Sequence, residues 1–161
     1  MRVPPNGWEE IKRYYGWSDA DLADVRAWAA RSLITVDVPA PMFYGADPVR
    51  RIYCHKAIAE ELVETFHEVV AAGVWDVIKN YSGCYVFRLK RNGTRLSMHS
   101  FGAAIDFDAP HNMMGTALER TAIGGTKEGR EVVDIFEARG WTWGGRFPTP
   151  DAMHFQWAKG Y

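Results

Sequence analysis

The stretch that decides the fold is residues 97–108, which read SMHSFGAAIDFD. From Ala103 onward the side chains alternate between two faces, as they do in a β-strand. One face carries Ala103, Ile105 and Phe107, and the other carries Ala104, Asp106 and Asp108. Because a carboxylate inside an apolar strand is costly unless it is paired or bound to a metal ion, Asp106 is a candidate functional residue.

Two histidines are candidates to lie beside Asp106. His99 precedes the strand, and Gly102 would let the backbone bend so that this imidazole returns over the carboxylate. His154 lies in a second apolar segment near the C-terminus. Each residue alone has an ordinary structural interpretation, as a core histidine or a turn anchor. Together, two imidazoles and a carboxylate are the ligand set of catalytic zinc, which leaves a fourth position to water.

Helices are expected mainly in the first half of the chain. We predict a short helix capped by Asn6, and a second helix that begins at the capping-box sequence of residues 18–21. A strand is predicted over residues 33–38, ending at the prolines that follow. The clearest helix is predicted over residues 56–72, with an apolar stripe and a stop at Gly73.

Strands are expected mainly in the second half. The predicted elements are a strand over 85–89, a turn at 92–93, a helix over 130–139, and strands near 141–143 and 153–157. In the first of these strands, Arg88 would point away from the aromatic face. Helices followed by strands predict an α+β fold with a small, mainly antiparallel sheet flanked by helices, as a single domain over residues 1–161.

Composition narrows the possible functions. A net charge of −1 argues against a nucleic-acid binder, since no excess of Lys and Arg is present to displace counterions. No apolar run suits a signal peptide or a membrane span, so we expect a protein that is cytoplasmic at synthesis and binds no membrane. We also expect a monomer. Cys54 and Cys84 form neither a disulfide scaffold nor a zinc knuckle; buried free thiols are the favoured interpretation, and whether they pair is left open.

The motifs together resemble a known family. They are Ser-x-His-x-x-Gly-x-Ala-x-Asp at 97–106, Trp-Gly-Gly at 143–145, Asp-x-x-His at 151–154, and the approach from Tyr81 to Arg88. This combination is similar to peptidase family M15, the zinc D-alanyl-D-alanine carboxypeptidases, and most of all to its endolysin-like branch of L-alanyl-D-glutamate endopeptidases. The resemblance covers residues 81–157 and implies a hedgehog/D-Ala-D-Ala-peptidase-like fold.

The resemblance implies a role for each matching residue. His99, Asp106 and His154 would bind Zn²⁺. Asp151 would be the general base and acid, although many members have glutamate there. Arg88 would face the scissile carbonyl, with Arg91 and Arg95 as nearby competitors, and Ser97 would touch substrate. His55 and His67 are expected to be structural or exposed.

The implied function is a zinc-dependent peptidase acting on peptidoglycan stem peptides. The endolysin-like features favour cleavage of the L-alanyl-D-glutamate bond by an enzyme of phage or prophage origin that reaches the wall after release. The alternatives are a D-alanyl-D-alanine carboxypeptidase and a non-catalytic, zinc-containing wall-binding module.

Overall fold

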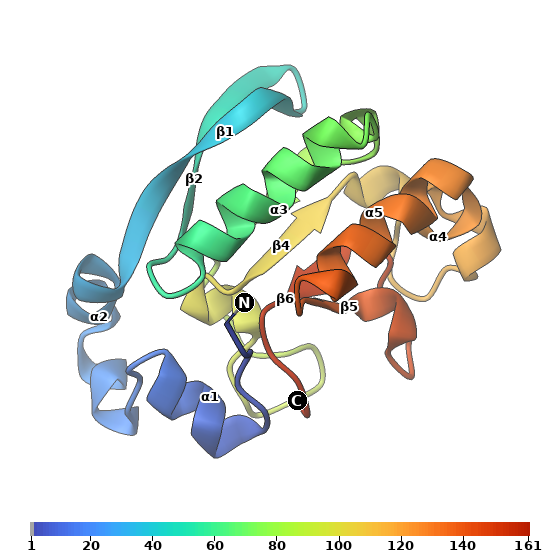
Figure 1. The fold of residues 1–161 in the computed structure, drawn as a ribbon. Helices are drawn as coiled ribbons and strands as arrows, with labels where there is room; N and C mark the ends of the chain where they lie inside the picture. Colours follow the sequence, from blue (N-terminus) through green and yellow to red (C-terminus); the bar gives the residue numbers. More distant parts are fainter. Residues whose placement is uncertain (1) are drawn as a thin grey trace.

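A four-stranded antiparallel sheet, in the order β3-β4-β6-β5, organises the second half of the chain (Figure 1). The computed structural model describes residues 2–161. The strands are β3 (Tyr81–Gly83), β4 (Ala104–Phe107), β5 (Thr142–Trp143) and β6 (His154–Gln156). In the register between β4 and β6, Asp106 pairs with His154 and Ile105 with Phe155. The sheet therefore sets the candidate carboxylate and one candidate imidazole side by side.

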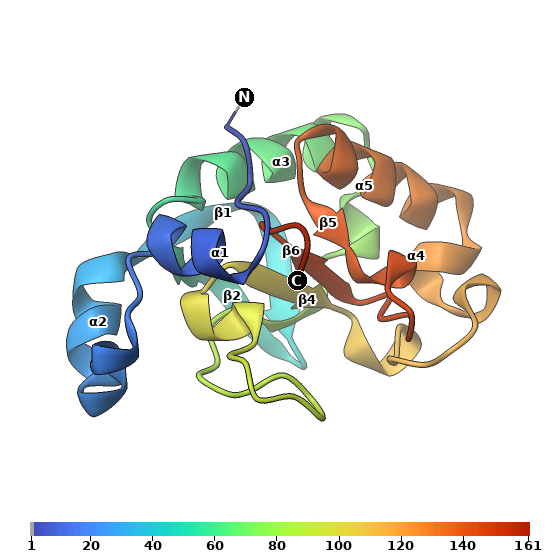
Figure 2. The ribbon, with the colours of Figure 1, turned by 90° about the horizontal axis from the view of Figure 1, so that it is seen from below.

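Two helices cover one face of this sheet, α3 (Ala59–Ala71) and α5 (Lys127–Ala138), as Figure 2 shows. Phe66 of α3 and Phe136 of α5 each pack against Phe107 of β4, with ring centroids 6.2 and 6.0 Å apart. Phe136 also packs against Phe155 of β6 at 4.4 Å. Because neighbouring residues of a strand point to opposite faces, Asp106 and His154 face away from this aromatic core. The α+β prediction is confirmed.

Two of the predicted helices, α3 and α5, exist with shifted starts. α3 begins at Ala59 rather than residue 56, and it ends before Gly73, whose φ is 74° as predicted for a stop. Val69 of this helix is buried in the core, whereas Val70 is exposed. α5 begins at Lys127 rather than residue 130, because the Thr126 hydroxyl accepts a hydrogen bond from the Gly129 amide and caps the helix earlier.

The N-terminal segment contains α1 (Trp8–Tyr14), the 3₁₀ helix η1 (Asp19–Ala23) and α2 (Val25–Ser32). The Asn6 cap was a wrong prediction: Gly7 holds the N-cap position of α1, without a side-chain bond. The capping box of Ser18 and Asp21 is present, but it caps η1. α2 has its own cap, the Asp24 carboxylate, which accepts from the Ala27 amide.

A long hairpin, β1 (Leu33–Tyr44) with β2 (Asp47–His55), lies beside α3 (Figure 1). The predicted stop at Pro39 and Pro41 is wrong, since β1 continues through both. The register shifts between Asp37 and Met42, so the prolines, which lack an N–H, sit in the irregular part of the ladder. The partner strand β2 was not predicted.

The strand predicted over residues 85–89 is also wrong. β3 lies earlier, and the following chain forms a loop closed by a single bridge between Leu89 and Leu96. Its tip has the predicted turn, with Asn92 at φ 58°. The prediction that Arg88 points away from an aromatic strand face therefore has no strand to rest on. Instead, the backbone N–H of Arg88 donates to the Ser100 hydroxyl at 2.9 Å.

Short helical turns complete the described chain. They are η2 (Trp75–Val77), η3 (Met98–Phe101), η4 (Ala109–His111), η5 (Leu118–Arg120), α4 (Ala122–Gly125) and η6 (Gly144–Arg146). Among the described residues, no helix has the length and apolar character needed to cross a membrane.

Candidate metal centre

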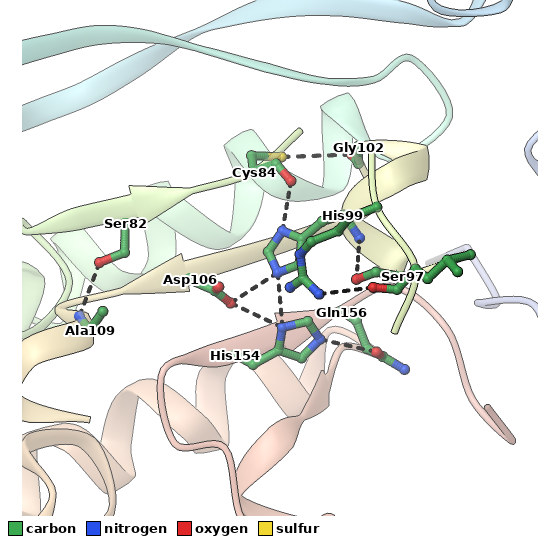
Figure 3. A network of polar contacts seen from close by, with 11 residues as sticks. Ser82, Cys84, Ser97, His99, Gly102, Asp106, Ala109, His154 and Gln156 are labelled. Atoms are coloured by element: carbon green, nitrogen blue, oxygen red, sulfur yellow. Dashed lines mark hydrogen bonds and ion pairs between the residues drawn. The ribbon is translucent and has the colours of Figure 1, made fainter. Parts of the chain in front are cut away.

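Three side chains from η3, β4 and β6 converge on one point, as Figure 3 shows. His99 Nε2 lies 3.2 Å from Asp106 Oδ1 and 3.2 Å from His154 Nδ1. His154 Nδ1 lies 3.0 Å from the same carboxylate oxygen. The structure thus brings together the three residues that the sequence nominated as metal ligands, as a candidate metal site within residues 2–161.

The outer nitrogen of each imidazole faces a hydrogen-bond acceptor. His99 Nδ1 lies 2.7 Å from the carbonyl oxygen of Cys84. His154 Nε2 lies 3.1 Å from Gln156 Oε1. The inner nitrogens face an acceptor too, the Asp106 carboxylate oxygen. When a cation binds the inner nitrogens, the hydrogen of each neutral ring lies on its outer nitrogen, where the carbonyl or amide oxygen accepts it. Two inner nitrogens and one carboxylate oxygen then offer three lone pairs to the same point.

Such a donor set fits a divalent metal ion. Three facing lone pairs repel one another unless a cation or protons lie between them. Zinc binds nitrogen and oxygen ligands at about 2.0–2.2 Å in a tetrahedron, which separates neighbouring ligand atoms by roughly 3.3 Å. The observed separations of 3.0–3.2 Å match this spacing. The fourth direction is left to the adjoining cleft.

The electrostatics of the centre agree with an attraction for positive charge. Burial by itself would raise the pKa of Asp106, but hydrogen bonds with His154 and His99 hold that pKa well below its usual range. Burial by itself would lower the pKa of His154, but the Asp106 carboxylate raises it above its ordinary value.

The turn that carries His99 is fixed at both ends. The Ser97 hydroxyl accepts a hydrogen bond from the His99 amide at 3.3 Å. Gly102 ends the turn at φ 61°, and a Cβ there would lie only 3.0 Å from the backbone nitrogen of His55. Glycine is required for both reasons. Ser97 also lines the cleft, which is compatible with its predicted contact with substrate. That contact stays a prediction.

Asp151 lies beside the centre, in a cleft of about 760 Å³. Its Oδ1 is buried and has no hydrogen-bond partner among the described residues. Burial raises the pKa of this carboxyl group, and the neighbouring Asp106 charge adds to the shift. Gly144 of the Trp-Gly-Gly motif permits this packing: a Cβ there would lie 2.5 Å from the Asp151 carbonyl oxygen and 3.0 Å from His154 Cβ.

A basic rim, defined as Arg88, Lys90 and Arg91, borders the same cleft. The side chain of Arg88 is exposed, and its Nη1 donates to the Leu89 carbonyl at 3.3 Å. The positive charge of Arg91 lowers the pKa of Asp151, against the larger effect of burial. Arg88 therefore lies where a substrate could reach it, and its predicted role at the scissile carbonyl stays a prediction.

Gln156 and Phe147 are among the cleft-lining residues that were not nominated from the sequence. Gln156 lies on the same face of β6 as His154, and that spacing of two was a usable signal. Phe147 lies near His154, with ring centroids 5.9 Å apart, and no sequence signal distinguished it from an ordinary loop aromatic.

The comparison with known families agrees with this geometry. Residues 91–157 match the family model described as D-alanyl-D-alanine carboxypeptidase. Over this range the chain is similar to peptidase family M15. The match includes His99, Asp106, Asp151 and His154, whereas Arg88 lies outside it. No curated protein and no solved structure matches the chain significantly. The family match and the candidate metal site together indicate a peptidase, with a peptide as its substrate.

Proposed function

We propose that this chain is a zinc-dependent peptidase that hydrolyses the stem peptides of bacterial peptidoglycan. The observation that carries the proposal is the convergence of His99 Nε2, Asp106 Oδ1 and His154 Nδ1 next to the unpartnered carboxylate of Asp151. Two imidazoles and one carboxylate leave a coordination position open, as in catalytic rather than structural zinc sites.

Zinc held by these residues would make a water nucleophilic at neutral pH and polarise the substrate carbonyl. Asp151 is suited to the proton transfers, because its buried Oδ1 forms no hydrogen bond that must first break. Its raised pKa brings the carboxylate closer to the operating pH, which strengthens it as a base and lets it return the proton to the leaving amine.

The basic rim supports a substrate that carries negative charge. Arg88 is the nearest counterpart of the arginine that the family resemblance implies, and it would stabilise the oxygen that becomes negative as the carbonyl is attacked. Lys90 and Arg91 border the same cleft and suit a peptide carboxylate. A D-glutamate residue beside the scissile bond offers such a group, which favours the L-alanyl-D-glutamate bond.

A D-alanyl-D-alanine carboxypeptidase is the second candidate function, favoured by the description of the matching family model. Its substrate also ends in a carboxylate, so the basic rim is compatible with both. A non-catalytic wall-binding module has less need of a buried, unpartnered Asp151 next to a complete ligand set.

Mass analysis of defined stem peptides after incubation with the zinc-loaded protein tests the proposal. We expect a new D-glutamate amino terminus for the endopeptidase, or released D-alanine for the carboxypeptidase. A chelator should abolish the product, and Asp151→Asn should slow its formation by about 10²–10⁴-fold. Stem peptides that stay intact with zinc-loaded, folded protein would leave the binding module as the better interpretation.

A further inference from the structure

We propose that Gln156 is a positioning residue that fixes the tautomer of His154, so that Nδ1 faces the metal. This inference rests on the proposed function only in taking the centre as a metal site. His154 and Gln156 are two residues apart on β6, so their side chains share a face, and Figure 3 shows the amide beside the imidazole. Gln156 is 4% exposed, so water does not compete freely for its amide.

The orientation of the Gln156 amide follows from its second contact. Gln156 Nε2 donates to the Ala158 carbonyl oxygen at 3.3 Å. A carbonyl cannot donate, so the NH₂ group must lie on that side, and Oε1 is left to face His154 Nε2 at 3.1 Å. Oε1 can only accept, so it favours the neutral imidazole with its hydrogen on Nε2, in competition with the Asp106 carboxylate that faces Nδ1 at 3.0 Å. The Nε2–H tautomer leaves the lone pair on Nδ1 free to bind the metal.

The two histidines of the centre are held differently. The ring of His99 donates to a backbone carbonyl, that of Cys84, and this contact is available whatever side chain stands at position 84. The ring of His154 donates to a side chain instead. Substitution of Gln156 can therefore remove the acceptor of His154, whereas no side-chain substitution removes the acceptor of His99. Outer partners of metal-binding histidines typically contribute about 10–100-fold to metal affinity.

The chain offers a matched control. The Ala158 carbonyl accepts a second hydrogen bond, from the Thr142 hydroxyl at 2.7 Å. Thr142→Val removes a hydrogen bond to the same carbonyl and leaves the contact between Gln156 and His154 in place. Gln156→Met removes the acceptor with little change of volume. Gln156→Glu keeps an acceptor and makes it stronger.

Long-range ¹⁵N–¹H correlation spectra of the metal-free proteins, recorded at alkaline pH where imidazoles are neutral, read the tautomer directly. We expect a larger share of the Nε2–H form of His154 in the wild type, Thr142→Val and Gln156→Glu than in Gln156→Met, where the Asp106 carboxylate is the acceptor left to the ring. Competition with a zinc chelator should show about 10–100-fold weaker binding for Gln156→Met alone.

An unchanged tautomer and affinity in Gln156→Met would overturn the inference. Equal losses in Gln156→Met and Thr142→Val would also overturn it, since the effect would then come from the Ala158 region. If Gln156→Met does not fold, Gln156→Glu decides: a retained Nε2–H form supports the inference and the other tautomer refutes it. Absence of peptide cleavage in all variants would count against the proposed function but leave this result standing.

Discussion

Two regions of the molecule bury histidine, and they use it in opposite ways. At the junction of β2 and α3, His55 is 3% exposed and both of its ring nitrogens have partners. Nε2 donates to the Tyr15 carbonyl at 3.2 Å, and Nδ1 accepts from the Ala57 amide at 3.0 Å. At the candidate metal centre, His99 and His154 are also buried, but each has one nitrogen directed at lone pairs.

The difference teaches which feature marks a ligand. Burial does not, and neither does the presence of a hydrogen-bond partner. What distinguishes a candidate ligand is that the second nitrogen of its imidazole ring has only hydrogen-bond acceptors as neighbours. His55 is satisfied without a cation, and burial lowers its pKa to about 4. For His154, the Asp106 carboxylate reverses that effect of burial and raises the pKa.

Removal of the Asp106 carboxylate, which faces both His99 and His154, is the strongest test of the difference between the two regions. Asp106→Ala should lower zinc affinity by more than the roughly 100-fold that an outer partner can contribute, because it removes a ligand and the local negative charge. Chelator competition measures the loss. His55→Gln is the control and should bind zinc as the wild type does. Equal binding by wild type and Asp106→Ala would mean that zinc binds elsewhere.

The proton-transfer group is the next largest contributor. Asp151→Asn should reduce kcat by about 10²–10⁴-fold, since it removes positioned acid–base catalysis. Zinc affinity should stay close to that of the wild type, which steady-state kinetics with chelator competition can establish. If this variant also loses zinc, Asp151 is a metal ligand, and the centre contains more than His99, Asp106 and His154.

The basic rim sharpens the comparison by asking which cations act on the reaction. Arg88→Ala should cost about 2.7–4 kcal/mol in transition-state stabilisation, or roughly 10²–10³ in kcat. Arg95, which lies over the Trp8 ring, provides the control substitution Arg95→Ala. If Arg88→Ala retains full activity and Arg91→Ala does not, the role belongs to Arg91.

His55 should make the fold sensitive to acid. Its pKa is about 4 in the folded chain and 6.5 in the unfolded chain, so the unfolded state binds more protons between these values. The contribution of His55 to the free energy of unfolding is therefore complete above pH 6.5. It should fall by about 3 kcal/mol on acidification to pH 4. Urea unfolding across this range should show a shallower fall in His55→Gln. Identical slopes would assign the acid sensitivity to other groups.

Gly102 joins the two regions and should give the smallest of these effects. Its carbonyl accepts from the His55 amide at 2.9 Å, and its left-handed φ of 61° ends the turn that carries His99. Gly102→Ala should destabilise the protein by about 1 kcal/mol or more, since alanine is strained there and its Cβ is crowded. Gly73→Ala, with positive φ but open space around the Cβ position, is the matched control. Equal losses in the two variants would show that crowding adds nothing.

Local patterns predicted much of the site and less of the fold. The motif residues could be nominated because each breaks a rule of its surroundings, such as Asp106 in an apolar strand. The hairpin partner β2 was missed, although only two residues separate it from β1, because most of its residues are exposed and its sequence, DPVRRIYCH, does not alternate apolar and polar side chains. The strand predicted at residues 85–89 failed because side-chain alternation does not reveal whether a partner strand exists.

The roles of the histidines also depended on distant contacts. The sequence around His55 does not predict that the Tyr15 carbonyl accepts a hydrogen bond from its ring. Nothing around His99 announces the Cys84 carbonyl that does the same for its Nδ1. Sequence pattern could rank His99 and His154 above His55 through their motif. It could not show which nitrogen of each ring is free.

A crystal structure of the zinc-loaded protein, with anomalous diffraction at the zinc edge, tests the central claim most directly. We expect one strong peak at about 2.0–2.2 Å from His99 Nε2, Asp106 Oδ1 and His154 Nδ1. A centre without a peak, or a zinc ion bound through the other nitrogen of either histidine, would contradict it.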